Sequence, residues 1–339
     1  MLGLTIILIL VLFMPFTIKV VERNLEVFLF IMGVSAVIIS QVLDKELISK
    51  ALVDPVNITL AVIVAGLIFR WLQNPMEKGI RGMSKAMPFR LFLALVVIVL
   101  GLISSVITAI IAAIVLVAIV SVLRLDRKSE IRLVILACFS IGLGAALTPI
   151  GEPLSTIATS KLNEDFFYLF HLIGPDVIPG VIIFGILAAV MIKPVNETNR
   201  MSIDQDTESY TEIIIRGFKV YLFVMALTLL GAGFEPFIEN YLLDLDHLVL
   251  FWINMISAVL DNATLAAAEI SPAMADDPAK IKAILLGLLI SGGMLIPGNI
   301  PNIIAAGKLK ITSLEWARFG VPVGLVAMIA YFIVIILVG

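Results

Sequence analysis

Runs of about 17 or more residues without a charge recur along this chain, and no other feature of the sequence constrains its fold as strongly. Such a run is long enough to cross a bilayer as an α-helix. Six apolar segments are predicted as single transmembrane spans: 2–18, 27–43, 56–72, 175–192, 213–233 and 319–338.

The composition supports the membrane class. Of the 339 residues, 61% are hydrophobic and only 14% are charged, whereas apolar residues make up less than about half of a soluble chain. The net charge of −3 indicates no nucleic-acid partner, and the single cysteine, Cys138, excludes an internal disulfide. The N-terminal segment lacks a basic start and a cleavage site, so it is predicted to be a first span. We therefore expect a multi-pass protein of the plasma membrane.

Four stretches do not fit one simple crossing each. Residues 91–123 and 247–275 are too long for one ordinary span and short for two. Residues 133–160 and 283–311 are each interrupted by a proline pair, in the sequences TPIGEP and IPGNIP. Proline removes a backbone donor and clashes with the preceding turn, so these helices are predicted to be broken. The prolines concerned are Pro149, Pro153, Pro297 and Pro301.

The basic residues of the connecting loops predict the topology. The loops 70–90 and 124–132 carry five and four Lys or Arg residues, so the positive-inside rule places both in the cytoplasm. Segment 91–123 then enters and leaves the membrane on one side, as a re-entrant hairpin. Its tip is expected near three hydroxyl residues, Ser104, Ser105 and Thr108. Both termini are predicted to lie outside.

The two halves of the chain are similar in sequence. ISSVITA at 103–109 aligns with ISAVLDN at 256–262, and GAALTPIGEP at 144–153 aligns with GGMLIPGNIP at 292–301. Each half has three crossings, an odd number, so the second half is predicted to be inverted relative to the first. The predicted fold is all-α, with about eight crossings and two re-entrant hairpins. Its predicted parts are scaffold spans (1–55), repeat A (56–192), a cytoplasmic linker (193–212) and repeat B (213–339).

Inverted repeats with discontinuous helices are the design of secondary transporters, in which unpaired backbone groups at the breaks hold an ion. Ordinary proline kinks are the alternative, but four prolines in matching positions favour a transporter. The sequence has no ATP-binding Gly-x-x-x-x-Gly-Lys motif. An intramembrane enzyme is also disfavoured, because the sequence has no His-Glu-x-x-His motif and no second intramembrane aspartate.

Two motifs resemble those of a known group. SAVLDNATLAAAEISP at 257–272 resembles the Ser-Asn-Thr hairpin tip of the ion transporter superfamily, and TPIGEP resembles its Thr-Pro-Ile-Gly-Asn/Thr-Pro break. Over about 56–338 the chain is most similar to the superfamily's predicted cation transporters, a domain-of-unknown-function family. More distant relatives are NhaD-type Na⁺/H⁺ antiporters, arsenite exporters and divalent-anion/sodium symporters. The resemblance implies a homodimer with an inner transport unit and an outer scaffold that includes the first two spans.

Two carboxylates stand inside the apolar core segments. A charge at bilayer depth costs about 2.5–3.5 kcal/mol, so Asp261 and Glu152 are candidate functional residues. Capping of the returning helix is the alternative role for Asp261, although Asn262 could cap without a charge. Glu152 stands where the superfamily has Asn or Thr, and the alignment makes Ile300 its counterpart in the second break. A solvated side chain in a hydrated break is the alternative for Glu152.

The predicted ion or substrate site combines these carboxylates with polar and glycine residues of the hairpins and breaks. Its members are Asp261, Asn262, Thr264, Glu152, Thr148, Gly151, Ser104, Ser105, Thr108, Gly298, Asn299 and Asn302. The predicted Na⁺ ligands are Asp261, Asn262 and Glu152, because Na⁺ is a hard cation that prefers oxygen. Five other polar residues are expected to have structural or surface roles, with snorkelling for those at span ends: Glu269, His171, Arg70, Glu315 and Arg318.

Segments 133–160 and 247–275 contain no Lys or Arg. The transported substrate is therefore predicted to be a cation and not an anion. A carboxylate that binds either Na⁺ or H⁺ gives exchange directly, because it must lose its proton to bind the metal ion. The sequence therefore predicts a Na⁺/H⁺ antiporter that works by alternating access, with no cofactor besides the transported ions. The alternative is a Na⁺-coupled transporter of a carboxylate, sulfate or other oxyanion, in which Asp261 and Asn262 hold only the coupling ion.

Overall fold

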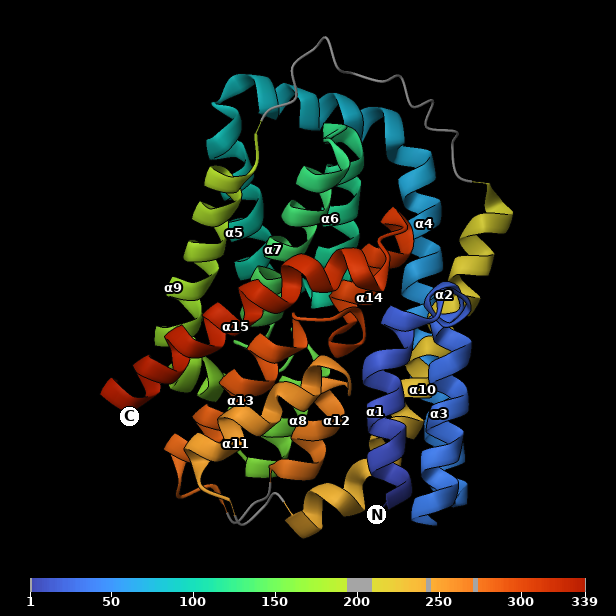
Figure 1. Ribbon diagram of the computed structural model, residues 1–339. Helices are drawn as coiled ribbons and strands as arrows, with labels where there is room; N and C mark the ends of the chain where they lie inside the picture. The colour runs from blue at the N-terminus through green and yellow to red at the C-terminus, as the bar shows by residue number, and fades with distance from the viewer. Residues whose placement is uncertain (1, 194–208, 242–244, 271–273, 339) are drawn as a thin grey trace.

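The computed structural model describes residues 2–193, 209–241, 245–270 and 274–338. Every regular element in these residues is a helix, in agreement with the predicted all-α class (Figure 1). Most of the predicted cytoplasmic linker, 193–212, lies outside the described residues.

Five of the described helices are long and apolar enough to cross a membrane, judged by length and composition. These stretches are Lys45–Val64, Phe89–Ile107, Tyr168–Met191, Tyr210–Phe237 and Ser313–Leu337. Shorter apolar helices include Gly3–Pro15, Leu25–Ser40 and Ala109–Leu123. The chain therefore has the structure of a multi-pass membrane protein. The stretch Phe89–Ile107, predicted to be one arm of a hairpin, is by itself as long as a spanning helix.

One side of the molecule is formed by α1 (Leu2–Thr17), α2 (Lys19–Arg23), α3 (Leu25–Ser40), α4 (Lys45–Ala86) and α10 (Tyr210–Tyr241) (Figure 1). Helices α3 and α10 pack closely, because glycines stand at their crossing. A methyl group at Gly33 would lie 2.9 Å from the carbonyl oxygen of Ala226, and one at Gly233 would lie 2.6 Å from the Cβ atom of Ala36. Small residues are typical of such close contacts in membranes.

Helix α4 corrects one prediction. The stretch 70–90 was expected to be a loop, but α4 continues through it as far as Ala86. Its Lys, Arg, Glu, Gln and Met residues are good helix formers, so a high density of charge does not end a helix there. In Figure 1 the C-terminal part of α4 runs across the top of the molecule to the next helix. The predicted boundary at residue 55 also lies inside α4.

The core is built from α5 (Phe89–Ile107), α6 (Ala109–Leu123), α7 (Arg127–Ala145), α9 (Tyr168–Met191), α13 (Pro278–Gly292) and α15 (Ser313–Val338). Helices α7 and α13 are its most buried members, since residues 133–148 and 283–296 are buried without exception. These are the two helices that lead into the proline pairs. The breaks therefore lie at the centre of the molecule.

Short helices complete the core. They are α8 (Pro153–Leu162), α11 (His247–Ile253), α12 (Asn262–Glu269) and α14 (Ile300–Leu309), with 3₁₀ segments η2 (Asn254–Ala258) and η4 (Ile296–Gly298). The predicted second hairpin, 247–275, is thus shorter and less regular than the first. Its residues 271–273 lie outside the described part of the chain.

Candidate functional site

The two breaks have the same backbone geometry, which we call the backbone frame: a helix end, a gap of several residues, and an N-cap residue that starts a second helix. Helix α7 ends at Ala145 and α8 begins after Glu152, while α13 ends at Gly292 and α14 begins after Asn299. The two N-cap residues have nearly equal backbone angles, φ −154° and ψ 159° for Glu152 and φ −155° and ψ 146° for Asn299. Helices α8 and α14 are both ten residues long and end in a left-handed residue.

This register corrects the sequence alignment by one residue. The counterpart of Glu152 is Asn299, and not Ile300 as predicted, because both residues occupy the N-cap. The sequence alignment paired Pro153 with Pro301, but Pro153 is the first residue of α8 and Pro301 is the second residue of α14. Proline is tolerated at either position of the first helical turn, so it does not define the register.

Hydrogen bonds recur in the same register. The Ser104 hydroxyl donates to the carbonyl of Ile141 at 3.0 Å, and the Ser257 hydroxyl donates to the carbonyl of Leu288 at 3.1 Å. Each acceptor lies eleven residues before an N-cap, that of Glu152 or Asn299. The predicted site residue Ser104 therefore joins α5 to α7 and is fully buried.

Glycine is required at the same place in each break. A methyl group at Gly151 would lie 1.9 Å from the carbonyl oxygen of Ala145. One at Gly298 would lie 2.6 Å from the carbonyl oxygens of both Gly292 and Ser257. The chain folds back onto the end of the preceding helix at both positions, and only a residue without a side chain fits.

The tip of the first hairpin rests on the first break. Thr108 separates α5 from α6 with φ 76° and ψ 148°, a conformation that β-branched residues rarely adopt. The N–H of Ala109 donates to the carbonyl of Gly151 at 2.8 Å, and the Thr148 hydroxyl donates to the carbonyl of Ser105. The Ser105 hydroxyl itself donates to Leu102, within α5.

Three buried polar side chains meet between the two breaks. Glu152, Asn262 and Asn299 are 5%, 3% and 4% exposed. The amides of Asn262 and Asn299 face the Glu152 carboxyl group, and Asp261 is close enough to interact with it electrostatically. We call Glu152, Asp261, Asn262 and Asn299 the central cluster. Asp261 is its one half-buried member.

Two members of the central cluster, Glu152 and Asn299, do not serve as helix caps. Neither Glu152 nor Asn299 makes a side-chain capping hydrogen bond, although both stand at N-cap positions. The Asn299 amide instead lies against α7, where a methyl group at Gly142 would be 2.9 Å from its nitrogen. Both side chains are therefore directed into the cluster and away from their own helices.

Two polar atoms of the central cluster are unsatisfied. Among the described residues, Oε1 of Glu152 and Nδ2 of Asn262 have no hydrogen-bond partner. More than about nine in ten buried polar groups in proteins are paired. A buried carboxylate oxygen without a partner is especially costly, so it is expected to bind a proton, a cation or water.

Other predicted site residues have structural contacts. The Asn302 amide donates to the carbonyls of Gly292 and Leu295 at 2.8 and 2.9 Å, which ties α14 to the end of α13. Pro149 lies in the gap between α7 and α8, and Pro297 lies in η4. Thr264 belongs to α12, but the contacts of its side chain lie outside what the structure describes.

Two polar pairs were not predicted. Glu269 is 1% exposed and accepts a hydrogen bond of 2.9 Å from the Asn254 amide, so its expected structural role has a specific partner. Glu315, which was expected to snorkel at a span end, also has a specific partner, because both of its carboxylate oxygens accept from Arg127, at 2.9 and 2.8 Å. Sequence spacing could not reveal these pairs, whose partners lie 15 and 188 residues apart.

The described residues contain no group of three or more His, Cys, Asp and Glu side chains that could hold a metal ion. A cation in the central cluster would therefore rely on one or two carboxylates, amide oxygens and backbone carbonyls. Such a ligand set suits a weakly bound, hard monovalent ion better than a transition metal.

Comparison with known families gives one result. A model of the family described as "Protein of unknown function (DUF1646)" matches residues 1–338. The chain belongs to the DUF1646 family. The match extends over the N-terminal helices α1 to α3 as well as both breaks, so the family model covers all of these parts. Among curated proteins, none matches this DUF1646 chain.

Proposed function

We propose that this DUF1646 protein is a Na⁺/H⁺ antiporter that works by alternating access. The observation that carries the proposal is the buried Glu152 carboxylate, which has an unpaired oxygen and faces two amides at the meeting point of the helix breaks. A proton or a Na⁺ ion could each satisfy that oxygen. Competition between them for one carboxylate is the simplest mechanism of exchange.

The charge balance of the central cluster favours a cation. At each break the C-terminal end of one helix faces the N-terminal start of the next, so their opposite dipole ends largely cancel. The cluster then holds two acidic side chains, Glu152 and Asp261, and one oxygen of the buried Glu152 carboxylate has no hydrogen-bond partner among the described residues. Amide oxygens and free backbone carbonyls would complete the shell of a dehydrated Na⁺.

We further propose that the two halves are inverted repeats with re-entrant hairpins, as in the ion transporter superfamily, and that the protein is a homodimer. The equal N-cap registers and the matching serine bonds support a repeat. Cysteines placed at Arg90, in the first turn of α5, and at Lys128, in the first turn of α7, should then react with a membrane-impermeant reagent from the same side. Reaction from opposite faces would contradict this topology.

The alternative is a Na⁺-coupled anion transporter. It is supported by the absence of side-chain caps at Glu152 and Asn299, which leaves N–H groups at the starts of α8 and α14 for an anion. In that case the carboxylates would hold only the coupling ion. Addition of a carboxylate, sulfate or arsenite would then stimulate Na⁺ uptake.

Reconstitution tests both functions. Purified protein in liposomes that contain a pH-sensitive dye should release protons from the lumen when Na⁺ is added outside. The Glu152→Gln variant should lose this response, and Glu164→Gln, which changes an exposed carboxylate after α8, should keep it. A proton flux that persists in Glu152→Gln at the native rate would contradict the proposal.

A further inference from the structure

A second buried carboxyl group lies at the far end of α12. Glu269 is the last residue of this helix and is 1% exposed, and Asn254, at the start of η2, is 0% exposed. The Asn254 amide nitrogen donates to Oε2 of Glu269 at 2.9 Å and to the carbonyl oxygen of Ile284 at 3.4 Å. Both acceptors fix the orientation of the amide, so its nitrogen and not its oxygen is directed at the carboxyl group.

Each side chain of this pair keeps one oxygen without a partner. Among the described residues, Oε1 of Glu269 and Oδ1 of Asn254 are buried and take part in no hydrogen bond. A carboxylate has no hydrogen to donate, so the pair has two unused acceptors and no donor left for them. A proton on Oε1 would remove the buried charge and supply the pair with a further donor. The Glu269–Asn254 pair therefore has the composition of a proton site.

A metal ion fits this pair less well than a proton. Hard cations take about six oxygen ligands. The neighbouring backbone oxygens already accept hydrogen bonds, that of Ile284 from the Asn254 amide and that of Asn254 from the Ser291 hydroxyl at 2.6 Å. Two unpaired oxygens are too few to replace the water shell of Na⁺, whereas a single proton needs no more than these two.

The charges on α13 and η2, which both pack near α12, do not neutralise a Glu269 anion. Helix α13 carries Lys280 in its first turn and Lys282, which pairs with Asp176 at 2.8 Å. The segment η2 carries no charged residue. Within the described part of the chain, Asn254 is the side chain that interacts with the Glu269 carboxyl group.

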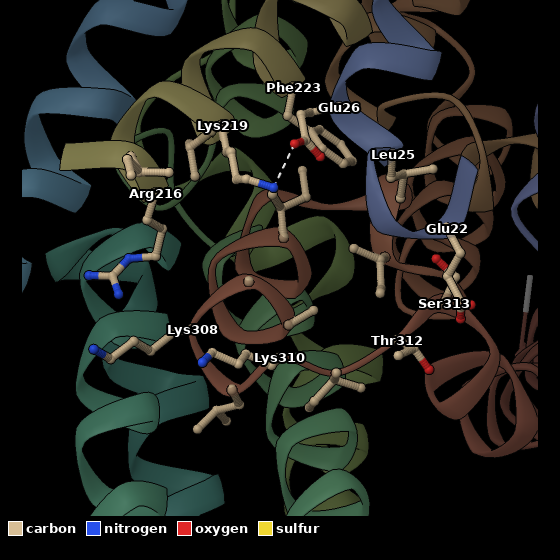
Figure 2. Close-up of a pocket in the computed structure, with 18 of the residues that line it drawn as sticks. Glu22, Leu25, Glu26, Arg216, Lys219, Phe223, Lys308, Lys310, Thr312 and Ser313 are labelled. Carbon is tan, nitrogen blue, oxygen red and sulfur yellow. Dashed lines mark ion pairs between the residues drawn. The ribbon is translucent and has the colours of Figure 1, made fainter. Parts of the chain in front are cut away.

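The other two neighbours of α12 are α8 and α10. On α8, the Lys161 ammonium group donates to the carbonyl of Ala267. On α10, Glu235 is exposed. The remaining described charges of α10 line a separate cavity of about 920 Å³, to which no described residue of α11, α12 or α13 contributes (Figure 2): Glu212, Arg216 and Lys219.

Helix α12 connects this pair with the central cluster. Asn262 at its start faces Glu152, and Glu269 follows seven residues later, two turns along the same face. At about 1.5 Å per residue, the two positions are about 10 Å apart along the helix. The Glu269–Asn254 pair is therefore separate from the central cluster but belongs to the same helix.

We propose that Glu269 and Asn254 form a second proton-binding site, at which Oε1 of Glu269 binds and releases one proton. On release, the proton passes to water and the electron pair stays on the carboxylate, which the N–H group of Asn254 then stabilises. In an antiporter this site would add one proton to those carried in each cycle. That role alone rests on the proposed function, whereas the site itself does not.

Infrared difference spectroscopy of the purified full-length protein tests the site, because a protonated carboxyl group has its own C=O stretching band. We expect one such band to decrease as pH rises and to be lost in Glu269→Gln. The Gln amide resembles the protonated acid, since its N–H can donate where the carboxyl O–H does, so this variant should fold with a Tm no lower than the native value. In Asn254→Ala the band should shift to higher frequency, because the carboxyl group loses its hydrogen-bond partner.

Two control variants separate this site from other carboxyl groups. Glu164→Gln, which changes an exposed carboxylate after α8, should leave the band unchanged. Glu152→Gln should lose exchange in liposomes but keep the band, so failure of the proposed function and failure of this site can be told apart. The proposal is overturned if Glu269→Gln removes no band or does not fold, or if the band does not decrease with rising pH while the protein is folded.

Discussion

At the start of α8 stands Glu152, and at the matching position of α14 stands Asn299. The two breaks agree in backbone angles, in the length of the following helix and in the glycine that precedes each N-cap. They differ in charge, since only the first contributes a carboxylate. The backbone frame is therefore independent of the ionisable group, and the group can be changed without loss of the frame.

The largest effect is expected from removal of that carboxylate. Glu152→Gln keeps the size of the side chain but removes its charge and its titration. Exchange in liposomes should therefore fall at least about tenfold, because the loss of one hydrogen bond or contact to a charged group typically has that effect on binding. The variant should remain folded by gel filtration, because an amide lowers the cost of burial. Exchange at the native rate with the native pH profile would mean that Glu152 has a structural role only.

A charge swap between the breaks sharpens the comparison. Glu152→Asn should be inactive, and the addition of Asn299→Glu should return a carboxylate to the central cluster from the opposite break. We expect the double variant to exchange about tenfold faster than Glu152→Asn alone, a typical coupling between residues in contact. The matched control is Glu152→Asn combined with Glu164→Gln. If the swap gives no recovery, the two breaks are not functionally equivalent.

The pH dependence separates competition from simple inhibition. A proton on the binding carboxylate excludes Na⁺, so the apparent Na⁺ affinity should fall as pH falls, by about tenfold per pH unit below the pKa of the site. The maximal rate at saturating Na⁺ should change much less. Binding can be measured by calorimetry on purified protein at several pH values. A Na⁺ affinity that does not vary with pH would contradict a shared carboxylate.

The smallest expected effects concern the glycines. Gly151→Ala and Gly298→Ala should both destabilise the protein, by about 1–3 kcal/mol as in other overpacked sites. The first should be the more severe, because its methyl group would lie 1.9 Å from a carbonyl oxygen, against 2.6 Å for the second. Gly307→Ala, where a methyl group meets nothing within 4 Å, is the control in α14. Equal Tm values for all three variants would show that the close turns relax freely.

Much of the fold could be predicted because apolar runs and prolines act locally. A run such as 319–338 is long and apolar enough to cross a bilayer, whatever the rest of the chain does. The proline pairs 149/153 and 297/301 do lie at interruptions between helices. The extent of α4 could not be predicted, because its charged residues form helices as readily as loops.

The site was predicted only in part, for a related reason. Asn299 was among the candidates, but its relation to Glu152 was hidden by prolines that occupy different positions of the first turn. The Arg127–Glu315 pair was hidden by separation along the chain, since two charges 188 residues apart have no signature in a sequence.

By itself, the sequence determined that this protein is an all-helical membrane protein and that its helices break at two proline pairs, because solvation and proline sterics depend on local residue type. The tertiary structure alone decided that Glu152, Asn262 and Asn299 share one buried cluster. Those encounters depend on how distant helices pack, and packing is set by contacts such as Gly33 against α10 and Gly142 against Asn299. No periodicity or motif encodes such contacts along the chain.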